Sequence, residues 1–364
     1  MSIAKKIRVL VVDDSAVVRK MITDALSQDP EIEVVGTACD PFVARDKILE
    51  LSPDVMTLDI EMPRMDGLTF LRILQQHRPM PVIIISSISQ AGSRAALDAI
   101  EYGAVDVLAK PRTAWNLGEL RDDLARRVKT AMGARLKNLR PSVNAAGTAA
   151  AAPIASGGEQ YNPRQLVVMG ASTGGTEALK DVLVRLPDGL PGILIVQHIP
   201  PVFSKTFAER LNEICAMEVR EAVHGDVVKP GLALIAPGDY HMVVSWENNS
   251  YRVQLRQDPP IHYTRPAVDM LFNSAARCAG SSALGVLLTG MGRDGAQGMQ
   301  QLKTVGATNL AQNEETCVVY GMPRAAVELG VVDRVLPLDQ IPHAIMHALN
   351  ERSSARKTTA AAFK

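Results

Sequence analysis

A serine, a histidine and an aspartate in the second half of the chain are of the types that together make a hydrolytic site. Ser172 lies in the small-residue stretch Gly-Ala-Ser-Thr-Gly, between an apolar run and an amphipathic segment. A strand-to-helix turn of this kind exposes the serine hydroxyl and points the next backbone N–H, that of Thr173, at a developing oxyanion. The pattern indicates that Ser172 is a nucleophile. The alternative interpretation is that the turn binds a phosphate.

A serine nucleophile needs a base, and the base needs a group that orients it. His198 directly follows the apolar run 192–197, and Asp294 lies in the loop after the apolar run 283–290. If these runs are parallel strands, the three side chains lie at one edge of a sheet. The turn at Ser172 also lacks the GxGxxG spacing and the P-loop lysine of phosphate-binding loops. These features favour a Ser-His-Asp triad, in a chain order that differs from that of α/β-hydrolases.

A second set of polar side chains follows apolar runs in the first half of the chain. Converging carboxylates repel one another unless a cation neutralises them, and oxygen ligands suit a hard ion such as Mg²⁺. A carboxylate beside Mg²⁺ and a lysine can attack a phosphoryl group and form an acyl phosphate. Each residue alone could be a solvated turn residue, but five of them at strand ends indicate one site. They are Asp13, Asp14, Asp59, Ser86 and Lys110.

The elements that must position these side chains have continuous rather than alternating apolar sequences. This indicates strands covered on both faces, and hence parallel sheets with helices between the strands. We therefore predict an α/β chain of two doubly wound domains. The predicted parts are a first domain over 1–125, a helical extension and flexible Ala/Gly/Ser/Pro linker over 126–162, a catalytic domain over 163–352 and a disordered tail over 353–364.

Length and composition exclude several classes of protein. With 364 residues and a formal net charge of zero, the chain has room for two domains and lacks the basic surface typical of nucleic-acid binding. Its apolar runs are too short to span a bilayer, and the N-terminus does not read as a signal peptide. The four cysteines are widely spaced and form no CxxC pair. They favour buried, reduced thiols and a cytoplasmic location.

The first half resembles the receiver domain of two-component response regulators. The resemblance rests on the stretches VLVVDDS, PDVMTLDIEMPRMDG, IIISS and VLAKP. It implies a flavodoxin-like fold and phosphorylation of Asp59 by a histidine kinase. Lys110 would contact the phosphoryl group and Ser86 would sense it. Mg²⁺ would be held by Asp13, Asp14 and Asp59.

The second half, and with it nearly the whole chain, resembles the chemotaxis protein-glutamate methylesterases of the CheB family. The shared stretches are GASTGGTEAL, VQHIPP, APGDYHM, RPAVDMLF, LLTGMGRDGA and VYGMPRAA. The resemblance implies a Rossmann-like, mostly parallel sheet with Ser172 as nucleophile, His198 as base and Asp294 as its orienting partner. Thr173 and Met291 would flank the oxyanion site, Met291 through its backbone N–H. No cofactor would be needed in this half.

The function implied by the two resemblances is that of a phosphorylation-activated serine hydrolase. It would demethylate glutamyl methyl esters, releasing methanol, and deamidate specific glutamines on methyl-accepting chemoreceptors during chemotactic adaptation. A chemotaxis histidine kinase would be the phosphodonor, and the chain would be peripheral to the membrane through receptors only. The linker favours a first domain that covers the triad until Asp59 is phosphorylated. The alternative is a response regulator with a nucleotide-binding output domain.

Four residues within these stretches receive no derived role. Val107 departs from the receiver pattern, because many receivers carry an aromatic switch residue at that position. Tyr240 and His241 lie in GDYHM, for which the sequence offers no chemistry. Arg265 would either guide an acidic substrate or form a salt bridge, and both interpretations stay open.

Overall fold

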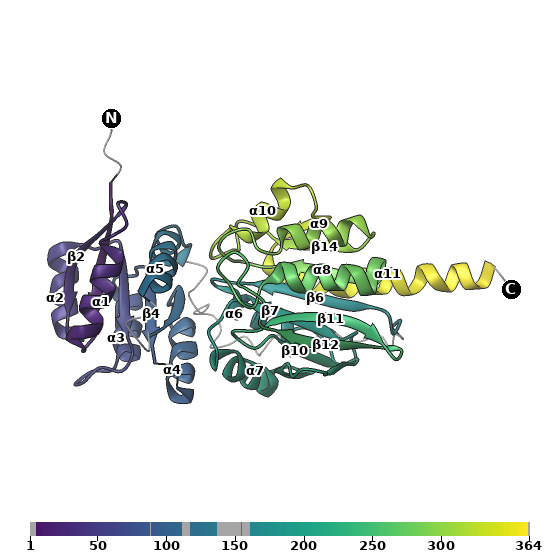
Figure 1. Ribbon diagram of the computed structural model, residues 1–364, viewed down its shortest axis with the longest axis horizontal. Coiled ribbons are helices and arrows are strands. Elements are labelled where there is room, and N and C mark those ends of the chain that lie inside the picture. The colour runs from purple at the N-terminus through teal and green to yellow at the C-terminus, as the bar shows by residue number, and fades with distance from the viewer. Residues whose placement is uncertain (1–4, 88, 111–116, 137–153, 155–160, 363–364) are drawn as a thin grey trace. The chain divides into compact units, whose positions relative to one another are not determined.

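The computed structural model describes residues 5–87, 89–110, 117–136, 154 and 161–362 (Figure 1). The chain divides into two compact units, residues 1–143 and 144–364. Each unit contains its own parallel sheet, so the predicted α/β class is confirmed.

The first unit is built on five parallel strands. They are β1 (Ile7–Val12), β2 (Ile32–Ala38), β3 (Val55–Asp59), β4 (Val82–Ser86) and β5 (Asp106–Ala109). Their order across the sheet is β2-β1-β3-β4-β5, the flavodoxin-like order that the resemblance implied. Every residue of β3 and β4 is buried, as expected for strands covered on both faces.

Five helices accompany these strands. They are α1 (Ala16–Leu26), α2 (Pro41–Leu51), α3 (Gly67–His77), α4 (Gln90–Glu101) and α5 (Leu117–Met132). Side-chain oxygens of Ser15, Asp40 and Asp66 accept hydrogen bonds from backbone N–H groups in the first turns of α1, α2 and α3. Such caps satisfy N–H groups that have no partner inside a helix, so they fix where each helix begins.

The second unit is built on seven parallel strands. They are β6 (Leu166–Ala171), β7 (Ile193–Gln197), β8 (Glu218–Glu221), β10 (Leu232–Ile235), β13 (Ala283–Leu287), β14 (Thr308–Gln312) and β15 (Arg334–Leu336). Their order is β15-β14-β13-β6-β7-β10-β8. A separate antiparallel sheet contains β9 (Val227–Val228), β11 (His241–Glu247) and β12 (Ser250–Arg256).

The core of the second unit joins its helices to both sheets. The helices are α6 (Gly175–Leu183), α7 (Phe203–Ile214), α8 (Val268–Ala279), α9 (Ala296–Thr304), α10 (Met322–Glu328) and α11 (Ile341–Ala362). Leu271 and Phe272 of α8 are fully buried together with Met242 of β11 and Val253 of β12. Figure 1 shows α8 lying beside β6 and β11. This packing fixes the position of the first turn of α8.

The structure differs from the prediction at two of the boundaries. The boundary at residue 125 falls inside α5, whose later residues Val128 and Ala131 are buried in the first unit. The tail predicted to be disordered over 353–364 is helical as far as Ala362, because its alanine-rich sequence has a high helix propensity and extends a helix that has already formed. Most of the predicted linker, 137–153 and 155–160, lies outside the described residues.

The thiols and the helices bear on two further predictions. All four cysteines are free, but they do not share one environment, since Cys317 is buried and Cys39 is exposed. The prediction that the thiols are buried is therefore wrong for Cys39, and Cys215 and Cys278 are only partly buried. Among the described helices, none has both the length and the apolar character needed to cross a bilayer.

Candidate functional site

Ser172 stands on a tight turn between β6 and α6. Its backbone N–H donates to the Thr289 carbonyl (3.0 Å), and its carbonyl accepts from the Gly175 N–H (2.7 Å). Gly174 has a φ of 75°, a left-handed conformation that glycine adopts without strain. A Cβ on Gly175 would lie 2.1 Å from the Gln197 amide oxygen, so only glycine fits there. The strand–turn–helix context expected for Ser172 is present.

The other two candidate triad residues follow the strands on either side of β6. His198 comes directly after β7, and its backbone N–H donates to the Ala171 carbonyl at the end of β6 (3.1 Å). Asp294 lies in the loop after β13. Because β13, β6 and β7 are neighbours, their carboxyl ends bring the three residues to one edge of the sheet. The strand order reverses at β6, which is where doubly wound sheets bind ligands.

His198 and Asp294 are hydrogen-bonded to each other. The distance between His198 Nε2 and Asp294 Oδ2 is 2.8 Å, and both side chains are almost fully buried. A carboxylate at Nε2 keeps the proton of a neutral imidazole on that nitrogen. Nδ1 is then the ring atom that can accept a proton from a nucleophile.

The N-terminus of α8 also holds the Asp294 carboxylate. Oδ2 accepts from the Val268 N–H (2.7 Å) and Oδ1 from the Asp269 N–H (2.9 Å). The N-cap residue of α8 is Ala267, which makes no side-chain cap, so Asp294 supplies the cap from another loop. Burial opposes ionisation, but the His198 hydrogen bond and these backbone donors hold the pKa of Asp294 below its usual range. Asp294 is therefore a fixed anion.

Of the two predicted oxyanion residues, Thr173 is adjacent to the serine and Met291 follows a glycine that packs against it. Thr173 follows Ser172 and is buried, and the Thr173 carbonyl accepts from the Thr289 hydroxyl (3.0 Å). A Cβ on Gly290, the residue before Met291, would lie 2.8 Å from Ser172 Cβ, so the chain passes close to the serine at Gly290. Ser172 is 8% exposed, and its hydroxyl makes no hydrogen bond to another described residue.

Gln197 is a supporting residue that sequence analysis missed. Its side chain is 3% exposed, and Nε2 donates to the carbonyls of Ser172 (2.9 Å) and His198 (3.2 Å). It thereby ties the turn after β6 to the turn after β7. A glutamine that ends an otherwise apolar strand was the available signal, because a buried amide needs hydrogen-bond partners.

His241 and Arg265 have structural partners near this edge. His241 is fully buried, with Nδ1 accepting from the Ala267 N–H (3.1 Å) and Nε2 bonded to the Pro259 carbonyl (3.1 Å). Arg265 donates from Nε to Asp239 Oδ1 (3.0 Å). Of the two interpretations of Arg265, the salt bridge is therefore the one present.

In the first unit, the five predicted residues lie at the carboxyl ends of the strands. Asp13 follows β1, Asp59 ends the neighbouring strand β3, and Lys110 follows β5. Lys110 Nζ lies 3.1 Å from Asp13 Oδ2 and 2.7 Å from Asp59 Oδ2. Carboxylate oxygens of Asp13, Asp14 and Asp59 lie within 4.8 Å of one another, with Asp14 exposed. Ser86 ends β4 and is fully buried.

The charge balance of this site fits a divalent cation. Burial and the nearby Asp13 charge raise the pKa of Asp59 to about 6, although the Lys110 ammonium acts in the opposite direction. One ammonium among three carboxylates leaves an excess of negative charge, and oxygen ligands of this kind suit a hard ion. Val107, the departure from the receiver pattern, is buried in β5. The arrangement can hold a cation and a phosphoryl group beside Asp59.

Comparison with known proteins accounts for both units. Residues 9–121 match the response regulator receiver domain, and residues 167–345 match the CheB methylesterase family. The protein-glutamate methylesterase/protein-glutamine glutaminase 2 of Syntrophus aciditrophicus is 52% identical over 341 residues, which cover 94% of this chain and 98% of that protein. The chain belongs to the CheB methylesterase family.

A second full-length relative and a solved catalytic domain also belong to the CheB family. The protein-glutamate methylesterase/protein-glutamine glutaminase of Bdellovibrio bacteriovorus is 49% identical over 354 residues, covering 97% of this chain and all of that protein. The crystal structure of the Thermotoga maritima CheB methylesterase catalytic domain is 41% identical, with a TM-score of 0.50, and covers 50% of this chain and 97% of its own. Membership of this family favours hydrolysis over a nucleotide-binding output domain.

Proposed function

We propose that this chain is a phosphorylation-activated methylesterase whose catalytic triad is Ser172, His198 and Asp294. The observation that carries the proposal is the 2.8 Å hydrogen bond between His198 and Asp294 at the strand ends beside Ser172. The substrate is a glutamyl methyl ester on a methyl-accepting chemoreceptor, in keeping with relatives that are protein-glutamate methylesterases. Hydrolysis of a glutamine side chain, with ammonia as the leaving group, is the second activity.

The reaction begins when Ser172 Oγ attacks the ester carbonyl. His198 Nδ1 takes the serine proton, and Asp294 stabilises the resulting imidazolium. The oxyanion forms beside the Thr173 and Met291 peptides. Collapse of the tetrahedral intermediate breaks the bond to the methoxy oxygen, which receives the proton from His198 and leaves as methanol. Water, deprotonated by His198, then cleaves the acyl-serine and yields glutamate.

The first unit is proposed to receive a phosphoryl group on Asp59 from a chemotaxis histidine kinase. Lys110 contacts the phosphoryl oxygens, and Ser86 bonds the new group and so senses it. Asp13, Asp14 and Asp59 would hold Mg²⁺, which when bound supplies positive charge to the carboxylates and the phosphate. We place the chain in the cytoplasm, in contact with the membrane only through receptors.

Replacing Asp59 by asparagine should remove activation while leaving the triad intact. A small phosphodonor such as acetyl phosphate, with Mg²⁺, should raise methanol release by the wild type about tenfold or more, because allosteric coupling is commonly of this size. The same donor should have no effect on Asp59→Asn. Asp54→Asn is the matched control, since Asp54 accepts the Arg8 N–H at the amino ends of β1 and β3, away from the carboxyl ends where Asp59 lies. If the phosphodonor activates Asp59→Asn as much as the wild type, activation through Asp59 is refuted.

Binding of Mg²⁺ should weaken below about pH 6. The pKa of Asp59 is raised to about 6, so as the pH falls through that value the carboxylate takes up a proton and is lost as a ligand. The apparent affinity should then fall about tenfold per pH unit, and it should change little above about pH 7. Isothermal titration calorimetry measures this profile. An affinity that does not depend on pH would contradict the role of Asp59 in the cation site.

A further inference from the structure

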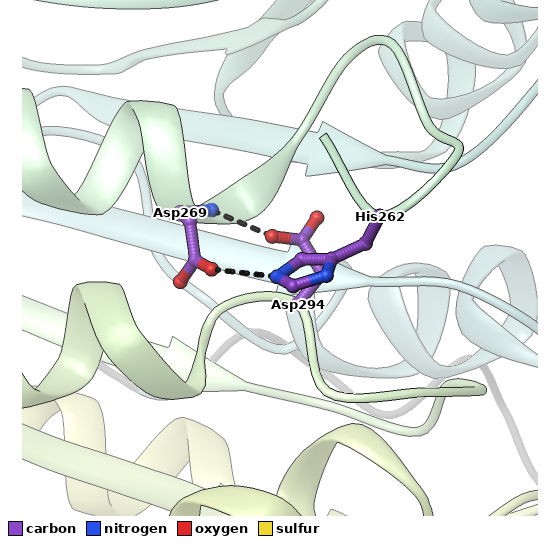
Figure 2. A group of neighbouring side chains, drawn as sticks. All are labelled: His262, Asp269 and Asp294. Atoms are coloured by element: carbon purple, nitrogen blue, oxygen red, sulfur yellow. Dashed lines mark hydrogen bonds and ion pairs between the residues drawn. The ribbon is translucent and has the colours of Figure 1, made fainter. Parts of the chain in front are cut away.

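Asp269 and His262 form a second pair of titratable side chains beside Asp294 (Figure 2). Asp269 lies in the first turn of α8 and is 4% exposed, whereas His262 lies in the preceding loop with its side chain 35% exposed. His262 Nε2 is 3.5 Å from Asp269 Oδ2. One nitrogen of His262 and one oxygen of each aspartate lie within 4.8 Å of one another. The proposed reaction uses only Asp294 of these three.

The two aspartates cap each other's helices. Asp294, just before α9, accepts from the first N–H groups of α8, and Asp269, in α8, accepts from the Gly298 N–H in the first turn of α9 (2.7 Å). The N-cap residues themselves, Ala267 and Gly295, make no side-chain cap. The N–H groups at the start of α8 therefore depend on a carboxylate just before α9, and those at the start of α9 depend on a carboxylate in α8. Through this reciprocal cap, Asp269 fixes the segment that carries Asp294.

A cap alone does not require a negative charge at position 269. The side-chain oxygen of asparagine would accept the same N–H. Burial and the Asp294 charge raise the pKa of Asp269 to about 6, against the Gly298 hydrogen bond and the His262 charge, which lower it. A second buried anion is therefore unfavourable in the resting protein. The negative charge of ionised Asp269 would instead stabilise the imidazolium that forms on His198 during the reaction.

We propose that Asp269, held by His262, is a positioning residue for the catalytic triad. The inference rests on the proposed esterase function. Asp269 aligns Asp294 through the reciprocal cap and adds a second negative charge behind it, which stabilises the transition state in which His198 carries a proton. The titratable groups that face Asp269 are Asp294 and His262, and a positive charge on His262 favours the ionised form of Asp269. Asp269 thus acts by aligning Asp294 and by the charge that it places behind that carboxylate, and His262 acts through Asp269.

The test is the pH dependence of methanol release by the full chain, activated with acetyl phosphate and Mg²⁺. At about pH 8, Asp269→Asn should lower kcat about tenfold and leave KM within about twofold, because the cap is kept and the charge is lost. As the pH falls through about 6, wild-type Asp269 also loses its charge, so the ratio of the two rates should approach one. Asp333→Asn is the matched control, because Asp333 accepts the Asn309 N–H (2.7 Å) at the amino ends of β14 and β15, away from the carboxyl ends that carry the site. Its rate should equal that of the wild type.

Two outcomes with Asp269→Asn would overturn the inference. One is a wild-type kcat at about pH 8. The other is a loss that stays the same at every pH, which is what a purely structural cap would give. Ser172→Ala separates this inference from the function on which it rests. If Ser172→Ala releases methanol as fast as the wild type, the proposed esterase mechanism is refuted. If Ser172→Ala is inactive but Asp269→Asn has the wild-type rate, only the role of Asp269 is refuted.

His262→Asn gives a second readout that does not depend on how well Asp269→Asn folds. His262 has a φ of 51°, and asparagine tolerates this conformation. Without the imidazole, ionised Asp269 loses the positive charge that a protonated His262 would supply. The ratio of the His262→Asn rate to the rate of the double variant His262→Asn/Asp269→Asn should also fall to one as the pH is lowered. The midpoint of this fall should lie at a higher pH than the midpoint for wild type compared with Asp269→Asn. A midpoint that stays in place or moves downward overturns the inference.

Discussion

Ser172→Ala should lose methanol release from methylated receptor membranes by roughly 10⁴-fold or more. The substitution removes the atom that is proposed to form the acyl-enzyme. It leaves the turn intact, because the hydrogen bonds to Thr289 and Gly175 are made by the serine backbone. His198, Asp294 and the oxyanion site remain, so only weak assistance to direct attack by water is left. The rate is measured on the full chain with acetyl phosphate and Mg²⁺.

The control for Ser172→Ala is a serine elsewhere in the same unit. Ser250→Ala removes a hydroxyl that bonds the Glu247 carbonyl in the β11–β12 hairpin, and it should retain the wild-type rate. Circular dichroism and thermal unfolding should show that both variants are folded. If Ser172→Ala keeps more than about a tenth of the wild-type rate, the serine is not the nucleophile. The phosphate-binding interpretation of the turn would then stand in its place.

Asp294→Asn should lower kcat by roughly 10³–10⁴-fold. The Asp294 carboxylate accepts three hydrogen bonds, from His198 Nε2 and from the N–H groups of Val268 and Asp269. An amide cannot accept all three, because its NH₂ group is a donor. If that NH₂ faces His198, the imidazole proton moves to Nδ1, the nitrogen that must accept the proton of Ser172. The base is then blocked although every residue around it is unchanged.

The pH profile distinguishes this effect from simple misfolding. Because the pKa of Asp294 is held below its usual range, wild-type Asp294 stays ionised across the neutral range and adds no step of its own to the profile. The loss in Asp294→Asn should therefore be similar from about pH 6 to 9, unlike the loss in Asp269→Asn. Asp188→Asn, on an exposed loop of the same unit, should be fully active. Near-wild-type kcat in Asp294→Asn would contradict the orientation of His198 by Asp294.

The placement of the three proposed triad residues could be predicted, because each of them follows a continuous apolar run. Parallel strands end at one edge of a sheet, so the sequence already places Ser172, His198 and Asp294 near one another. The sequence does not show which strands are neighbours, nor that Asp294 contacts Nε2 of His198. Those depend on the order β13-β6-β7 and on the packing of α8.

The residues that escaped prediction have partners far away in the chain. Asp269 reads as an ordinary acid in an amphipathic helix until Gly298, 29 residues later, is found at its side chain. The antiparallel sheet was missed for a different reason. Asn248 and Asn249 both have positive φ in the tight turn between β11 and β12, and this pair was a recognisable hairpin signal. The helical tail was missed because composition was weighed without the helix that precedes it.

The most direct test of the account is the rate at which phenylmethylsulfonyl fluoride modifies Ser172 in the full chain. Mass spectrometry locates the sulfonyl group, and methanol release is followed in parallel. We expect one adduct, on the peptide that carries Ser172, with activity lost in proportion. Acetyl phosphate and Mg²⁺ should speed the labelling of the wild type but not of Asp59→Asn. Fully labelled protein that still releases methanol would contradict the role of Ser172 as nucleophile. A labelling rate that is the same with and without phosphorylation of Asp59 would contradict activation through Asp59.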